Sequence, residues 1–179
     1  LSDVSDWNPQ YLIPIVKTIK CADTIIPAIE GILNYHKGEY DEALRLFEIS
    51  EPIINHDQAL IEYYEMKFYH CLTLIQIYKN NKNPKHLERT EKYIEKYKPF
   101  GRISPEYLGP RHKLMEILYR SVNSTDIFSI ADEMEDILEE TRKFGLVIIE
   151  AVINEILLEF CDEHNFQKGV CRMYFSNCF

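Results

Sequence analysis

The chain has 179 residues, with 29 acidic and 20 basic side chains and a formal net charge of −9 at pH 7. This charge repels nucleic-acid phosphates and anionic lipid headgroups, so nucleic acid is not an expected partner. Six glycines and eight prolines are too few for the many turns of an all-β protein, and apolar residues recur at helical spacing, which predicts a single all-α domain over residues 1–179.

The first predicted elements form a helical hairpin. Residues 1–23 are a lead-in in which a helix could begin near Pro14. The pattern then predicts a helix over 24–36 with Pro27 in its first turn, a turn at Gly38, and a partner helix over 40–53.

The packing of this hairpin is indicated by the stretch GILNYHKGEYDEALRLFEISEP. Small residues at Gly31 and Ala43 let the helices approach closely. Tyr40, Leu44 and Phe47 then fill the seam, because residues three or four apart share a helix face. The order of small residue, glycine turn, aromatic, alanine and aromatic resembles a tetratricopeptide repeat, which implies a scaffold and no chemistry of its own.

The next predicted helix covers residues 57–78 and has two apolar faces. One face includes Phe68 and Ile75, and the other includes Met66 and Leu74. Such a helix is buried from two sides, as the stacking of helix pairs requires.

Two further helices follow in the pattern. Asn83 is a suitable N-cap and Pro84 a suitable first residue for a helix predicted to end near Tyr97, where Pro99 and Gly101 stop it. Ser104 and Pro105 are predicted to start another helix. Gly-Pro at 109–110 must bend or restart that helix before its apolar face over 114–122.

The clearest amphipathic helix is predicted over 127–143, with a cap at 123–125. Basic residues fill its last turn, and Gly145 suits the left-handed position after it. Helices over 146–161 and 166–179 complete about four pairs in residues 24–179. The apolar run that ends at Cys161 is interrupted by Glu and Asn, which indicates a core helix and no membrane span.

The order of four segments carries a wider resemblance. These are GEYDEALRLFE, EMKFYHCLTLIQIY, FGRISPEYLGPRHKLMEILY and ADEMEDILEETRKFGLVIIEAVINEILLEFC. Together they resemble the helical region of large multidomain sensor kinases, including fungal hybrid histidine kinases, where it follows an AAA-type ATPase module and precedes a GAF domain. The resemblance covers most of residues 24–179 and implies that kinase and ATPase activities belong to other domains. The chain itself has no G-x-x-x-x-G-K-[ST] phosphate loop and no phospho-accepting histidine box.

Two sets of residues could carry binding chemistry. Cys161, His164, Cys171 and Cys178 make a zinc site geometrically possible, but C-x2-H-x6-C-x6-C is not a usual zinc signature, so core packing is the simpler interpretation. The acidic face over 132–140 could hold a cation, dock a basic partner or be a solvated outer surface.

Aromatic residues and one Cys/His pair offer two more hypotheses. The cluster Tyr63, Tyr64, Phe68 and Tyr69 could line a peptide groove, although core filling is the simpler interpretation. His70 and Cys71, the one adjacent His/Cys pair, point about 100° apart on a helix and cannot easily share a proton.

We therefore expect a right-handed stack of antiparallel helix pairs that acts as a non-catalytic scaffold and interaction module. No catalytic, cofactor-binding or metal-binding residue is predicted, and the expected partner is a protein or flanking domain. The odd number of cysteines and the absence of a start like a signal peptide predict reduced thiols in a cytoplasmic protein. The first residue, Leu1, suggests a segment of a longer chain, which the resemblance identifies as a two-component sensor histidine kinase. The alternative is a free-standing tetratricopeptide adaptor that binds a peptide.

Overall fold

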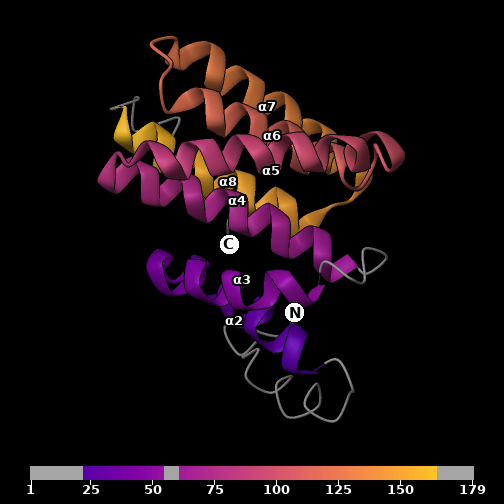
Figure 1. The fold of residues 1–179 in the computed structure, drawn as a ribbon. Coiled ribbons are helices and arrows are strands. Elements are labelled where there is room, and N and C mark those ends of the chain that lie inside the picture. The colour runs from indigo at the N-terminus through magenta and orange to yellow at the C-terminus, as the bar shows by residue number, and fades with distance from the viewer. Residues whose placement is uncertain (1–21, 55–60, 165–179) are drawn as a thin grey trace, which may run out of the picture. The chain divides into compact units, whose positions relative to one another are not determined.

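The computed structural model describes residues 22–54 and 61–164, and Figure 1 shows the path of the chain. The described residues form helices joined by short turns, with no strand among them. The all-α class predicted from the sequence is therefore confirmed for this part of the chain. The lead-in over 1–21 and the helix expected over 166–179 lie outside it. The helices are α2 (Ala22–His36), α3 (Tyr40–Ile54), α4 (Ile61–Asn81), α5 (Pro84–Ile103), α6 (Gly109–Ser121), α7 (Ile127–Phe144) and α8 (Val147–Glu163).

Contacts within the chain divide it into two compact units, residues 1–77 and residues 78–179. The boundary falls inside α4, so the first unit contains α2, α3 and most of α4. The second unit contains the end of α4 and the helices from α5 to α8. Each unit has fully buried large side chains, for example Phe47 in the first and Leu114 in the second.

The turn between α2 and α3 is made as the sequence predicts. Gly38 has a φ of +76°, a left-handed conformation that glycine adopts without steric cost. Its N–H donates to the carbonyl of Tyr35 at 2.9 Å, which satisfies a carbonyl at the end of α2. One detail differs: α2 already includes Ala22, so Pro27 lies in its second turn and not in its first.

The seam between α2 and α3 depends on the two small residues identified from the sequence. A Cβ atom placed on Gly31 would lie 2.6 Å from Cε1 of Phe47, so only glycine allows this approach. Ala43 and Phe47 are completely buried. Tyr40 and Leu44 are half-buried and lie at the edge of the seam. The predicted close approach at Gly31 and Ala43 and the burial of Phe47 are confirmed, whereas Tyr40 and Leu44 are buried only in part.

The part of α4 in the first unit supplies the other wall of this core. The ring of His70 stacks on that of Phe47 with 5.5 Å between ring centroids and 21° between planes. Every residue from 66 to 75 is buried. Core filling, the simpler interpretation of the aromatic cluster, is correct for its buried members, while Tyr64 is half-buried. The buried members are Tyr63, Phe68 and Tyr69.

An ion pair links α3 to α4 in the same unit. The ammonium group of Lys67 contacts the carboxylate of Glu51, and the Lys67 side chain is 6% exposed. The ammonium also lies 5.4 Å from the ring centroid of Tyr63, a cation–π distance. A charge this far from water is stable only when it is paired, so the pair connects the two helices through electrostatics as well as packing.

Helix α5 begins as predicted but ends later. The side chain of Asn83 accepts a hydrogen bond from the N–H of Lys85 at 3.1 Å, as an N-cap does. The expected end near Tyr97 is wrong, because α5 continues through Pro99 and Gly101 to Ile103. Gly101 does not terminate the helix: a Cβ atom there would lie 3.2 Å from the Cβ of His112, so glycine serves the close packing of α5 against α6.

Helix α6 begins later than expected, whereas α7 begins at the expected residue, Ile127, but has a different cap. Residues 104–108 form a bend and a turn, and α6 restarts at Gly109, which was one of the two outcomes that the Gly-Pro pair allowed. The cap of α7 is Asp126 and not residues 123–125, because its carboxylate accepts the N–H of Ser129 at 3.1 Å. Gly145 ends α7 in the predicted left-handed conformation, with a φ of 69°.

The apolar face predicted for α7 is confirmed, and α8 provides a second apolar helix beside it. The buried residues of the α7 face are Ile130, Ala131, Met134, Ile137, Leu138 and Thr141. In α8, Asn154 is fully buried; its amide N–H donates to the carbonyl of Glu150 at 2.9 Å, but its Oδ1 has no hydrogen-bond partner within residues 22–54 and 61–164.

This orphaned oxygen leads to a stability prediction. An unsatisfied buried carbonyl costs about 1–3 kcal/mol, so Asn154→Leu should raise the free energy of unfolding by about 1 kcal/mol in urea titrations. Thr141→Val is the matched control, because the Thr141 hydroxyl is buried but donates to the carbonyl of Leu138 at 2.7 Å. We expect no gain there, and an equal gain at both positions would contradict the argument.

Candidate interaction groove

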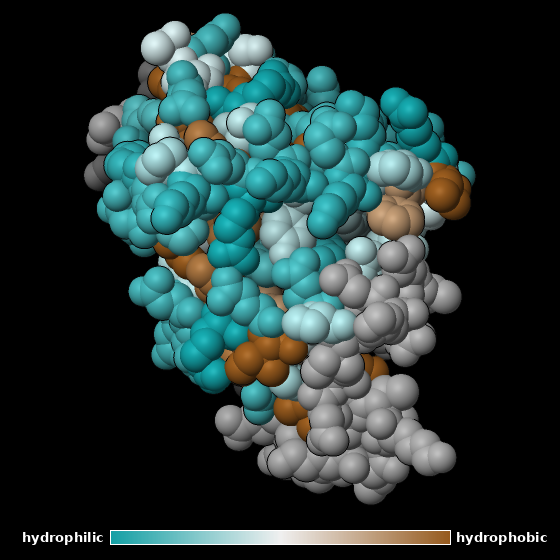
Figure 2. Space-filling view, in the orientation of Figure 1, coloured by the Kyte–Doolittle hydropathy of each residue, from teal (hydrophilic) through white to brown (hydrophobic). Residues whose placement is uncertain are grey.

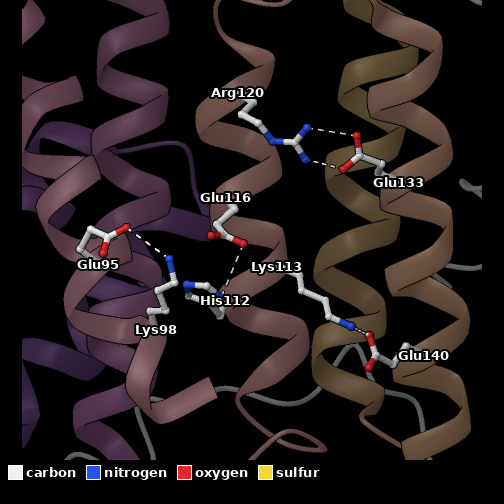
Figure 3. A network of polar contacts seen from close by, with 8 residues as sticks. All are labelled: Glu95, Lys98, His112, Lys113, Glu116, Arg120, Glu133 and Glu140. Carbon is white, nitrogen blue, oxygen red and sulfur yellow. Dashed lines mark hydrogen bonds and ion pairs between the residues drawn. The ribbon is translucent and has the colours of Figure 1, made fainter. Parts of the chain in front are cut away.

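Two ion pairs join α6 to α7 at different positions along the helices (Figure 3). Lys113 of α6 donates to Glu140 of α7 at 2.7 Å. Two turns further along α6, the guanidinium of Arg120 binds both carboxylate oxygens of Glu133. The two pairs fix an antiparallel register and place Glu116 of α6 level with Asp136 of α7, midway between them.

A hollow of about 250 Å³ lies between these two ion pairs. Its charged lining comprises both pairs together with Glu116 and Asp136, and two isoleucines provide apolar surface. Four carboxylates therefore face two cations. The lining residues are Lys113, Glu116, Ile117, Arg120, Glu133, Asp136, Ile137 and Glu140.

A second hollow of about 500 Å³ shares Arg120 and Glu133 with the first. It lies near the end of α6 and the start of α7, where Ser124 and Ser129 contribute hydroxyl groups. The Arg120–Glu133 pair thus stands where the two hollows meet. We refer to the two hollows together as the α6–α7 groove.

The charges in the groove do not balance at neutral pH. The hydrogen bond from Arg120 lowers the pKa of Glu133, so this carboxylate is ionised and neutralised by its partner. Lys113 forms an ion pair with Glu140. Asp136 forms no ion pair within the described part of the chain, and the ion-pair contact of Glu116 is made with His112. The lining therefore has four carboxylates and two permanent cations, an excess of two negative charges, and the charge of Glu116 also acts on Arg120.

His112 lies one turn before Glu116 on α6, where it contacts Tyr97 and Gly101 of α5. Its ring is stacked on Tyr97 with 8° between planes, and its Nδ1 is 3.6 Å from a carboxylate oxygen of Glu116. Burial is the main cause that lowers the pKa of His112, with a contribution from the ammonium of Lys98, while Glu116 and Glu95 act against it. The ring is therefore neutral at pH 7 and provides no positive charge to Glu116.

Only part of the acidic face predicted over 132–140 lines the groove. Glu133, Asp136 and Glu140 line the groove, whereas Asp132 and Glu139 lie outside its lining. The pKa of Glu135 is raised, first by desolvation and then by repulsion from neighbouring carboxylates on α7. In Figure 2 hydrophilic side chains dominate the described surface in the upper part of the view, where Figure 1 places α5, α6 and α7.

The α6 side of the groove was not predicted. Lys113, Glu116 and Arg120 are spaced at i, i+3 and i+7, so they share one face of α6, and this spacing is the signal that the sequence contained. It becomes informative only when the register with α7 is known, because the same charges would otherwise form an ordinary solvated helix face.

The cysteine and histidine hypotheses fall outside the groove. Cys71 and Cys161 are free and buried, and burial raises the pKa of the Cys71 thiol, which keeps it protonated and unreactive. Cys171 and Cys178 of the possible zinc site are not among the described residues. Within 22–54 and 61–164, no group of three or more His, Cys, Asp or Glu side chains is arranged to hold a metal ion. None of the helices described has the length and apolar character needed to cross a membrane.

Comparisons of the chain with protein-family models, curated proteins and solved structures found no match.

Proposed function

We propose that this chain is a non-catalytic helical scaffold that binds a protein partner in the α6–α7 groove, and that the partner segment carries Lys or Arg side chains. The observation that carries the proposal is the excess of two carboxylates in the hollow, where Glu116 and Asp136 lie outside the two ion pairs. A cation from a partner would offset this excess of negative charge.

The geometry of the hollow favours a side chain over a large ligand. A volume of about 250 Å³ accommodates one or two side-chain ends, and the isoleucines at 117 and 137 offer apolar surface to the methylene stem of a lysine or arginine. Exposed charge contacts contribute little individually, about 0.2–1 kcal/mol each, so useful affinity requires several contacts along the partner segment. The second hollow, which continues past the Arg120–Glu133 pair, extends the available surface.

The wider role follows from the hairpin and from the resemblance. The contact of Gly31 with Phe47, together with the glycine turn, supports a tetratricopeptide-like hairpin, and a right-handed stack of such pairs remains our proposal for the whole chain. The resemblance to sensor kinases favours a cytoplasmic signalling protein, a two-component sensor histidine kinase whose phosphorelay is carried by other domains. The alternative is a free-standing adaptor. The coding sequence on either side distinguishes them, because the kinase setting requires ATPase, GAF or kinase modules there.

A charge-matched pair of variants tests the groove. We expect penta-lysine, added to the ¹⁵N-labelled chain at pH 7.5, to shift the amide resonances of residues 113–120 and 133–140. Replacing Glu116 by Gln together with Asp136 by Asn should weaken binding about tenfold, the value of two exposed charge contacts.

The control for this experiment removes the same charge from outside the groove. Asp132→Asn with Glu139→Gln leaves the lining intact, so the affinity for penta-lysine should change less than twofold, which is the scale of distant screened charges. Equal losses in the two double variants would mean that penta-lysine responds only to net charge, and the groove would then not be the binding site.

A further inference from the structure

The contact between His112 and Glu116 joins a buried titratable ring to the groove. Nδ1 of His112 faces the Glu116 carboxylate at 3.6 Å, and the two residues lie one turn apart on α6. The same carboxylate lines the hollow between α6 and α7. The Glu116 carboxylate is therefore shared by the contact with His112, drawn in Figure 3, and by the lining of the groove.

The surroundings of the ring hold it in place. The side chain of His112 is 12% exposed, its face is stacked on Tyr97, and its Cβ lies 3.2 Å from the position that a Cβ on Gly101 would take. Nε2 is buried, and the backbone of Ile94 on α5 acts on the ring as a hydrogen-bond partner that favours its charged form. The ring cannot turn away from Glu116 without disturbing the packing of α5 against α6.

The charged groups that face His112 come from both helices. On α5, Lys98 disfavours a positive ring and Glu95 favours it, and these two groups pair with each other at 3.7 Å. On α6, Glu116 favours the positive ring. Glu95 and Lys98 act on the ring in opposite directions, and Glu116 has the largest effect of the three charged groups.

We infer that His112 and Glu116 form a proton-controlled switch that sets the charge of the α6–α7 groove. At neutral pH the ring is neutral and the Glu116 carboxylate is available to a cation in the groove. When the ring gains its second proton, Nδ1 and Nε2 each carry a hydrogen, the Nδ1–H of the imidazolium pairs with the Glu116 carboxylate, and the groove loses one of its two excess negative charges. Linkage makes the effect reciprocal, so a cation bound beside Glu116 hinders protonation of His112.

The direction of the pH effect follows from the environment of the ring. Burial lowers the pKa of His112 below its ordinary value of 6.5, so the unfolded chain takes up the proton first. The neutral His112 ring therefore contributes fully to the stability of the fold above pH 6.5, and this contribution is lost as the pH falls through the folded-state pKa. Acidification therefore weakens the packing of α5 on α6 and, over the same pH range, removes one negative charge from the groove.

The first test uses the free chain and needs no partner. We expect the Cε1–H resonance of His112, assigned with His112→Gln, to titrate below pH 6.5. Glu116→Gln should lower that midpoint further, because the carboxylate favours the charged ring. Amide resonances that line the groove should follow the same midpoint in the original chain and lose this response in Glu116→Gln.

Glu95→Gln is the matched control, because Glu95 also favours the charged ring but does not line the groove. It should lower the midpoint and leave the coupling of the groove amides to His112 intact. A midpoint at or above 6.5, or groove amides that ignore the titration of His112, would overturn the inference.

The second test measures the consequence for binding and rests on the proposed function. The affinity for penta-lysine should fall about threefold between pH 7.5 and a pH below the midpoint measured for His112 in the first test, which is the loss of one exposed charge contact, and should not fall in Glu116→Gln. An equal fall in both proteins would overturn the role of Glu116. If penta-lysine does not bind at pH 7.5, the proposed function fails, while the proton coupling is decided by the titration of the free chain alone.

Discussion

Gly31→Ala should destabilise the chain by about 2 kcal/mol, although helix propensity alone favours alanine over glycine by about 1 kcal/mol. The reason is steric. The new Cβ would lie 2.6 Å from Cε1 and 2.9 Å from Cδ1 of Phe47, and both distances are too short for carbon atoms in contact. The ring cannot move aside, because Phe47 is completely buried and stacked on His70. Urea unfolding followed by far-UV circular dichroism measures the loss.

The same substitution at Gly109 is the control. Gly109 is also helical and buried, but a Cβ there would meet its nearest neighbour, the carbonyl oxygen of Gly101, at an ordinary 3.8 Å. Gly109→Ala should therefore be neutral or slightly stabilising. In the double variant Gly31→Ala with Phe47→Leu, the smaller side chain should relieve the clash, so the combined loss should be at least 1 kcal/mol less than the sum of the two single losses. Additive losses would show that the two residues do not meet as described.

This hairpin was predictable because its determinants are local. Gly31, Gly38, Ala43 and Phe47 lie within 17 residues, and each contributes a property that its residue type determines: small size, a positive φ, or apolar bulk. Local determinants do not depend on the register of distant helices. The order and spacing of the residues therefore sufficed to predict both the turn and the seam.

The end of α5 was not predictable for the opposite reason. Pro99 and Gly101 are local helix-ending signals, yet α5 continues past both of them. The ring of Tyr97 stacks on His112, and Gly101 lets α6 approach, so contacts with another helix stabilise the extra turn. Here tertiary packing outweighs the local preference, which sequence spacing alone does not reveal.

Prediction of the groove requires both the local spacing of charges and the packing of one helix against another. The acidic residues of α7 were evident from the sequence, but their division into groove-lining and outward-facing groups depends on the pairing of Lys113 with Glu140 and of Arg120 with Glu133. These pairs join residues 13 to 27 positions apart. Charge spacing on one helix shows which side chains share a face, and only the register between helices shows what that face meets.

The ion pair between Glu51 and Lys67 should produce the other large effect. Glu51→Gln leaves the ammonium of Lys67 in the core without this carboxylate, and we expect a loss of about 3 kcal/mol, the cost of breaking a buried pair. The Lys67 side chain is only 6% exposed, so water cannot readily replace the carboxylate. Urea unfolding at pH 7 measures this loss.

The companion variant removes both charges. Lys67→Met with Glu51→Gln replaces the buried ammonium by an apolar side chain of similar length and the carboxylate by a neutral amide, so stability should return to within about 1 kcal/mol of the original chain. Lys113→Met with Glu140→Gln is the exposed counterpart, because the Lys113 side chain is 53% exposed. Breaking that pair with Glu140→Gln alone should cost less than about 1 kcal/mol. A small loss in Glu51→Gln, comparable to that in Glu140→Gln, would mean that Lys67 reaches water, and the link between α3 and α4 would then depend on apolar packing alone.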